Sequence, residues 1–137
     1  MVGFPLSSWS LWLRLENAAG LAAFCCIYGL SGYNWWVFAA LLLVPDLSML
    51  GYLLGRRVGA VAYNLGHSYA GPALITCGAA IHWGEAALPY ALIWAAHISL
   101  DRMLGYGLKS FDGFRFTHLG TVGRAKMTGR PPDGATT

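Results

Sequence analysis

The chain has 137 residues, of which 56% are hydrophobic and 11% are charged, and its formal net charge is +3. Soluble domains carry roughly 25% charged residues, so this composition excludes an ordinary soluble protein and favours helices that cross a membrane. The length indicates one domain. The basic residues flank the apolar stretches and do not gather on one face, which argues against a nucleic-acid partner.

Four apolar stretches follow one another, each long enough to cross a hydrocarbon core about 30 Å thick. The sequence therefore predicts an all-α fold, an integral membrane bundle of four transmembrane helices. The expected spans cover about residues 11–30, 35–55, 58–81 and 85–108. They form a predicted four-span membrane domain over residues 1–124, and the glycine-rich, basic residues 125–137 are expected to be a flexible cytoplasmic tail.

The first two expected spans each contain an acidic residue. Glu16 lies in the opening turns of the first, and the second has Pro45 and Asp46 in its middle. Proline removes a backbone donor and kinks a helix, so Asp46 is expected to be a buried acid beside freed carbonyl groups. A carboxylate inside a membrane is costly, which indicates a partner or a function.

The last two expected spans are richer in polar groups. The third includes the polar side chains of Tyr63, Asn64, His67, Ser68 and Tyr69. The fourth has His97, Asp101 and Arg102 near one of its ends. His97 and Asp101 are four residues apart, so they lie on the same face of their helix.

Four spans place both termini on one side of the membrane, together with the short loop at Arg56 and Arg57. Every Lys and Arg then lies on or near that side, and the opposite side has Glu85 as its one formal charge. By the positive-inside rule the basic side is cytoplasmic. The expected location is the cell inner membrane, as a multi-pass protein with both termini cytoplasmic.

Three ionisable side chains are expected at one depth. Asp46, His67 and His97 each lie about nine or ten residues from the cytoplasmic end of their span, which is roughly 14–15 Å at 1.5 Å per residue. This depth is near the centre of the hydrocarbon core. Asp101 lies one turn nearer the cytoplasm on the same face as His97. The sequence therefore predicts a polar His/Asp chamber at mid-membrane.

Two imidazoles and two carboxylates that converge suit a divalent metal, with zinc, iron or manganese fitting better than magnesium. The predicted metal ligands are His67, His97 and Asp101, and Asp46 is either a further ligand or a general base. A metal would make a bound water nucleophilic near neutral pH. These four residues form the predicted catalytic set. Three neighbours are expected to orient the ligands or bind substrate, namely Tyr63, Asn64 and Ser68.

A structural interpretation stands beside the metal hypothesis. Buried polar side chains also hold membrane helices together. Asp46 could pair with His67, and Asp101 with His97, without any ion. At a shallower level, Glu16 and Arg102 are predicted to form a structural ion pair.

The order of these motifs is specific. Pro45-Asp46, Tyr63-Asn64, His67, Asp101-Arg102 and the stretch from Gly105 to Lys109 follow one another in the chain. In this the sequence resembles a family of small bacterial membrane proteins that is catalogued as a domain of unknown function. The resemblance covers about residues 15–124. It implies a four-helix membrane domain and supplies no activity.

A second resemblance is narrower. Pro45-Asp46, Arg56-Arg57 and His67-Ser68 stand in the order found in a family of membrane-bound, metal-dependent hydrolases, to which the sequence is similar. Ser48 stands where that family has a second aspartate. This resemblance implies a metal site and hydrolysis.

Two functions follow from these observations. The first is a metal-assisted membrane enzyme that acts by hydrolysis or acid–base chemistry on a lipidic or small apolar substrate. The alternative is a non-catalytic membrane subunit or an oligomeric carrier, whose His/Asp cluster is structural or relays protons. The expected partners are membrane lipid and either further copies of the chain or a larger membrane complex.

Overall fold

The computed structural model describes residues 8–110, 113–117 and 120–121, and the predicted tail at 125–137 lies outside them. Five α-helices make up most of this part: α1 (Ser8–Leu30), α2 (Trp35–Leu41), α3 (Arg56–Gly66), α4 (Ala70–Gly78) and α5 (Leu88–Leu104). Shorter helical pieces lie between them: the 3₁₀ helices η1 (Val44–Leu54) and η3 (Glu85–Ala87) and the π-helical turn η2 (Ala79–Trp83). The predicted helical character is confirmed.

A small antiparallel sheet follows α5, which the sequence did not predict. Its strands are β1 (Lys109–Ser110), β2 (Gly113–Thr117) and β3 (Gly120–Thr121), in the order β1-β2-β3. Strands of two to five residues carry too little alternation to stand out in a polar, glycine-rich stretch.

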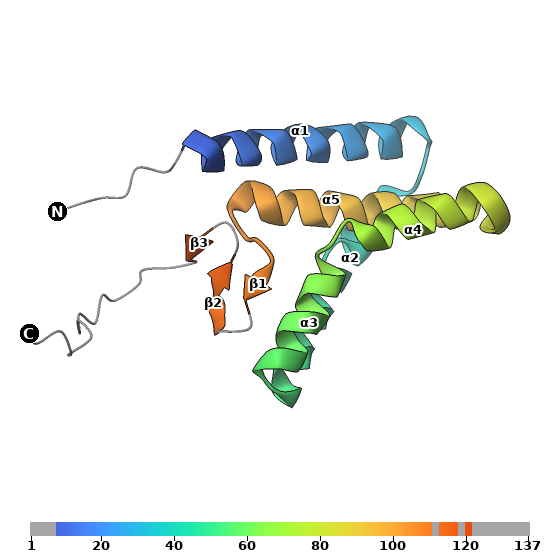
Figure 1. The fold of residues 1–137 in the computed structure, drawn as a ribbon. Coiled ribbons are helices and arrows are strands. Elements are labelled where there is room, and N and C mark those ends of the chain that lie inside the picture. Colours follow the sequence, from blue (N-terminus) through green and yellow to red (C-terminus); the bar gives the residue numbers. More distant parts are fainter. Residues whose placement is uncertain (1–7, 111–112, 118–119, 122–137) are drawn as a thin grey trace, which may run out of the picture.

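The two longest helices, α1 and α5, lie side by side along their lengths (Figure 1). Small residues permit this approach, as is usual between membrane helices. Gly20 of α1 faces Ser99 of α5, so a Cβ at position 20 would lie 3.4 Å from the Ser99 hydroxyl oxygen. At the far end of this pair, Tyr28, Phe38 and Ile93 form an apolar core that brings α2 against both helices.

The C-terminal end of α5 is closed by a glycine and an arginine. Gly105 adopts a φ of 96°, a left-handed conformation that glycine adopts without strain and that commonly ends helices. Arg14 of α1 donates a hydrogen bond from Nη2 to the carbonyl of Leu104, at 2.7 Å. A cation at this end also complements the helix dipole.

The second and third expected spans are each divided. The second is α-helical over α2, breaks at residues 42–43 and continues as the 3₁₀ helix η1. Pro45 lies in the first turn of η1 and lacks the N–H that a continued α-helix would need. The third breaks between α3 and α4, at residues 67–69, which we call the α3–α4 elbow.

Because of these breaks, η1 and α3 form a separate helical hairpin, the η1–α3 hairpin, which runs across the direction of α1 and α5 (Figure 1). Gly55, with a φ of 125°, closes its turn. Two glycines let its arms touch. A Cβ at Gly51 would lie 2.9 Å from the Cβ of Ala62, and a Cβ at Gly59 would overlap the ring of Tyr52.

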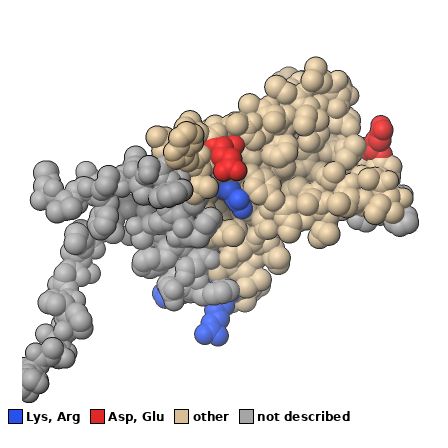
Figure 2. All heavy atoms as spheres, turned by 45° about the horizontal axis from the view of Figure 1, so that its top comes forward, with Lys and Arg blue, Asp and Glu red and all other residues tan. Residues whose placement is uncertain are grey.

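One stretch of the described residues, Trp35–Leu54, is long and apolar enough to cross a membrane, and Ala70–Ile81 forms a shorter apolar helix. The first of these contains the break at residues 42–43, so it is not one straight helix. Figure 2 shows few charged side chains on the face in view. These observations support a membrane location and leave the number of spans as a prediction.

Candidate functional site

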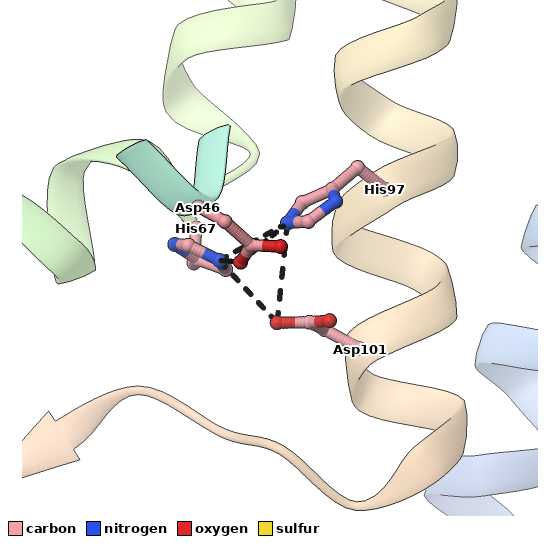
Figure 3. A group of neighbouring side chains, drawn as sticks. All are labelled: Asp46, His67, His97 and Asp101. Carbon is pink, nitrogen blue, oxygen red and sulfur yellow. Dashed lines mark hydrogen bonds and ion pairs between the residues drawn. The ribbon is translucent and has the colours of Figure 1, made fainter. Parts of the chain in front are cut away.

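Four side chains from three elements point into one space beside α5 (Figure 3). His97 and Asp101 lie one turn apart on α5. Asp46 comes from the first turn of η1, and His67 follows the last residue of α3. Both breaks therefore lie at the site, because His67 belongs to the second break and Asp46 follows the first break within one turn of η1.

The ligand atoms of these four residues are spaced as metal ligands are. One atom from each lies within 4.8 Å of all the others. His67 Nε2 is 3.4 Å from Asp46 Oδ1 and 3.3 Å from Asp101 Oδ2. The corresponding distances from His97 Nε2 are 3.6 Å and 4.0 Å, and the two Nε2 atoms are 3.1 Å apart. Four ligands at about 2.0–2.1 Å around a tetrahedral ion would be roughly 3.3–3.4 Å apart.

The proton of His67 is placed by the backbone. Its Nδ1 lies 2.9 Å from the carbonyl oxygen of Tyr63. A carbonyl only accepts, so Nδ1 carries the hydrogen and donates it. In the neutral ring Nε2 then presents a lone pair to the two carboxylates. A metal ion, or a proton on either Nε2 atom, relieves the repulsion between this lone pair and the carboxylate oxygens, and a metal-ligating histidine has this same tautomer.

Burial differs across the site. Both histidines are buried, whereas the Asp46 side chain is 41% exposed and that of Asp101 is 18% exposed. The histidine side is thus closed by protein, and the side of Asp46 is open. Catalytic metal sites keep one such position for water or substrate, while structural sites are closed on all sides.

Tyr63 supports two of the four residues. Its ring stacks on the imidazole of His67, with centroids 3.8 Å apart and planes 12° from parallel. Its hydroxyl donates to Asp101 Oδ2 at 3.3 Å. Sequence reasoning grouped Tyr63 with Asn64 and Ser68 as residues that orient ligands or bind substrate. In the structure Asn64 is half-buried on α3, and Ser68 Oγ accepts a hydrogen bond from the N–H of Ala70 at the start of α4.

The α3–α4 elbow is held by donors from α5 that sequence reasoning missed. Trp94 Nε1 donates to the carbonyl of Gly66 at 2.5 Å, and Arg102 Nη2 donates to the carbonyl of His67 at 3.4 Å. The last carbonyls of a helix have no partner within it, so these side chains satisfy what the break exposes. Trp94 lies on the same α5 face as His97, three residues away. An indole N–H inside an apolar helix needs an acceptor, which was the available signal.

Arg102 was predicted to pair with Glu16. The two residues line the same cavity, of about 520 Å³, between α1 and α5. The guanidinium of Arg102 takes other partners, namely the His67 carbonyl and the ring of Tyr69, whose centroid is 4.6 Å away. Tyr69 in turn bonds through its hydroxyl to Asn17 at 3.0 Å and to the hydroxyl of Ser99 at 2.8 Å. Arg102 therefore secures the elbow that carries His67.

An apolar cavity of about 410 Å³ adjoins the site. Pro45, the neighbour of Asp46, lines it together with residues of α2, α4 and α5, namely Leu41, Ile75, Tyr90, Ile93 and Trp94. Its lining is almost entirely hydrocarbon and aromatic ring. An apolar group of a ligand would therefore fit in this cavity, next to the residue that precedes Asp46.

Comparison with known proteins identifies a family and no activity. Residues 10–122 match the family described as "Domain of unknown function (DUF4260)", so the chain belongs to this family. The match includes all four residues of the cluster, and it confirms the resemblance to a family of unknown function. No curated protein and no solved structure matches the chain. The similarity to metal-dependent hydrolases stays a prediction.

Proposed function

We propose that this protein is a metal-dependent membrane hydrolase that acts on a lipidic substrate. His67, His97 and Asp101 hold a divalent transition metal, and Asp46 is the general base. The observation that carries the proposal is the convergence of four ligand atoms from three elements within 4.8 Å. The hydrogen bond from His67 Nδ1 to Tyr63 supports it, because it leaves Nε2 free for an ion.

Each residue has a role that its position supports. A divalent ion in this site would polarise a carbonyl and make water nucleophilic at neutral pH. Asp46 is the most exposed of the four, so it is the carboxylate best placed to accept a proton from water. Tyr63 holds Asp101 and His67 in position through its hydroxyl and its ring. Imidazole and carboxylate ligands favour zinc, iron or manganese.

Two observations support a lipidic substrate. The apolar cavity next to Pro45 has room for part of an acyl chain. The chain also contains a stretch, Trp35–Leu54, that is long and apolar enough for a membrane environment, and Asp46 of the site lies within it. We further propose both termini on the cytoplasmic side of the cell inner membrane, from the distribution of Lys and Arg.

Elemental analysis of the detergent-purified protein tests the metal. We expect about one equivalent of a divalent transition metal per chain, lost in His67→Ala and in His97→Ala. Glu85→Gln removes a charge outside the cluster and should keep the metal, which makes it the control. A wild-type protein without bound metal, and without a rise in Tm when zinc, iron or manganese is added, would overturn the proposal.

Hydrolysis is tested separately. Asp46→Asn should keep the metal and lose most of the turnover of a long-chain fluorogenic ester, because a neutral amide cannot accept a proton. If the metal-loaded wild type cleaves no ester of any chain length, the metal site remains and the hydrolase assignment fails.

One observation favours the alternative of a carrier. Both middle helices are broken at the site, and membrane carriers place binding sites at such discontinuous helices. A carrier would move protons or the metal itself across a liposome membrane, which a trapped pH or metal dye would report. Uptake that disappears in His97→Ala would favour the carrier over the enzyme.

A further inference from the structure

The η1–α3 hairpin exposes a continuous apolar line. A 3₁₀ helix has three residues per turn, so residues three apart lie directly above one another. In η1 this line is formed by apolar side chains that are 46% to 82% exposed, those of Val44, Leu47, Leu50 and Leu53. No other described element covers them. A line of this kind needs an apolar environment.

The second arm of the hairpin adds to this surface, and its tip is cationic. Val58, Val61 and Leu65 of α3 are exposed and recur at helical spacing. Arg56 and Arg57 at the turn are both exposed. Asp46, the one acidic residue of the hairpin, points into the His/Asp cluster. The exposed surface is therefore hydrocarbon ending in two positive charges, which matches acyl chains bordered by lipid phosphates.

The direction of the hairpin decides how it meets the membrane. The expected spans at residues 11–30 and 85–108 correspond to α1 and α5, the long antiparallel pair. Membrane helices tilt by about 20° on average from the bilayer normal, so with these two spans as predicted the pair gives the direction of the normal. The hairpin runs across that pair (Figure 1). It therefore lies along the plane of the bilayer.

The depth of the hairpin follows from where it joins α5. Its root meets α5 at His97 and Asp101, and α5 ends at Leu104. At 1.5 Å per residue these positions are about 10 Å and 5 Å from the cytoplasmic end of α5. Amphipathic helices that lie in a membrane interface bury their apolar face to roughly 5–10 Å, at the boundary of headgroups and acyl chains.

We propose that the η1–α3 hairpin lies in the plane of the cytoplasmic leaflet, with its exposed leucines among the acyl chains and with Arg56 and Arg57 at the lipid phosphates. The His/Asp cluster then opens at the headgroup–acyl boundary and not at the bilayer centre. The choice of substrate bond rests on the proposed hydrolase function. At the headgroup–acyl boundary, the bond within reach of the cluster is the acyl ester of a glycerolipid. Water cleaves the bond between the acyl carbon and the glycerol oxygen: its hydroxyl goes to the acyl carbon, which gives a fatty acid, and its other hydrogen goes to the glycerol oxygen, which gives a lysolipid.

Spin-label depth measurements test the position of the hairpin without any activity. Cys25, Cys26 and Cys77 are first replaced by alanine, and single cysteines are then placed at Leu47, Leu50 and Leu53. The labelled proteins are reconstituted into vesicles of phosphatidylethanolamine and phosphatidylglycerol. Accessibility to oxygen, compared with a water-soluble nickel reagent, gives the depth of each label. We expect one shallow depth for all three positions.

Helix α1 provides the matched control. Leu15, Ala19 and Ala22 are exposed on it, and labels there should become steadily deeper, by about 1.5 Å per residue along the helix. A comparable gradient from Leu47 to Leu53, about 12 Å in all at 2.0 Å per residue, would overturn the in-plane hairpin. Labels that neither reagent reaches would show that protein, such as a second copy of the chain, covers the apolar side chains of η1. That result would also overturn the in-plane hairpin.

The result is independent of the proposed function. Equal depths in a protein that binds no metal would remove the hydrolase and leave the hairpin in place. A depth gradient in a protein that binds metal would overturn the in-plane hairpin and leave the proposed metal site in place. Each variant is accepted only if its helical circular dichroism and its elution volume match those of the cysteine-free parent, so that loss of folding is not mistaken for either outcome.

Discussion

At the scale of single residues, His67 joins more interactions than any other member of the cluster. Its Nδ1 donates to Tyr63, its Nε2 faces both carboxylates, and its own carbonyl accepts from Arg102. The sequence was enough to select the four cluster residues, because ionisable side chains are rare in apolar stretches. Three of them were expected at one depth, and Asp101 was expected on the same helix face as His97. It could not predict the tautomer or the role of Arg102, since both depend on backbone carbonyls that a helix break exposes.

Tyr63→Phe isolates the hydroxyl that reaches Asp101. The ring stack on His67 is kept, so the fold should persist, while the ligand carboxylate loses its donor. Removing a partner of a metal ligand typically lowers metal affinity by about 10–100-fold. Competition with a fluorescent chelator measures the change. Tyr90→Phe, at a half-exposed tyrosine outside the His/Asp cluster, is the control for metal affinity. Equal affinities in the two variants would contradict the role given to Tyr63.

Trp94→Phe tests the support of the α3–α4 elbow. Phenylalanine keeps most of the ring volume but cannot donate to the Gly66 carbonyl, and a buried acceptor without a partner costs about 1–3 kcal/mol. We expect a lower Tm in detergent for Trp94→Phe. Trp36→Phe changes an exposed tryptophan and should leave Tm unchanged. A similar Tm in both variants would show that the elbow does not depend on this hydrogen bond.

At the scale of elements, hydropathy reveals where apolar helices lie but not whether they run straight. The kink at Pro45 was predicted, because proline lacks the donor that a helix interior needs. The direction in which η1 and α3 run was not predicted, since an apolar stretch has the same composition in a straight span and in a broken one. Pairing through Gly51 and Gly59 becomes visible only when the two arms are seen in contact.

Gly59→Val tests that pairing. A side chain at position 59 would overlap Tyr52 on η1, and overpacking of this kind costs about 1–3 kcal/mol. Because the hairpin carries Asp46 and His67, we expect both Tm and metal content to fall. Val61→Leu enlarges an exposed side chain on the same helix and serves as the control. Unchanged metal content in Gly59→Val would mean that the arms need not touch for the site to form.

At the scale of the whole molecule, composition was sufficient to predict helices, and one apolar stretch, Trp35–Leu54, supports the predicted membrane location. The family match covers most of the chain. The number of spans stays a prediction, because the count assumes that each apolar stretch crosses the membrane as one straight helix. The structure instead pairs α1 with α5 and sets the η1–α3 hairpin across them. The side of the membrane on which the termini lie remains a prediction from the charges.

Reporter fusions check that prediction. A fluorescent protein fused after Thr137 should fluoresce, and alkaline phosphatase fused there should be inactive, because both termini are expected in the cytoplasm. Phosphatase inserted at Gly32, in the turn after α1, should be active, since that turn lies at the opposite end of α1. Active phosphatase at the C-terminus would reverse the orientation and would place the η1–α3 hairpin in the outer leaflet.

The division of the cluster between the η1–α3 hairpin and α5 also sets an order of events during folding. Asp46 and His67 arrive with the hairpin, whereas His97 and Asp101 are synthesised later, on the last helix. No pair of adjacent helices in the chain holds a complete ligand set, so α5 must dock before an ion finds all its ligands. Contacts between residues far apart in sequence form late. If the cluster holds the proposed metal, uptake of the ion would signal that assembly is finished, and a chain truncated before α5 should insert into the membrane without acquiring an ion.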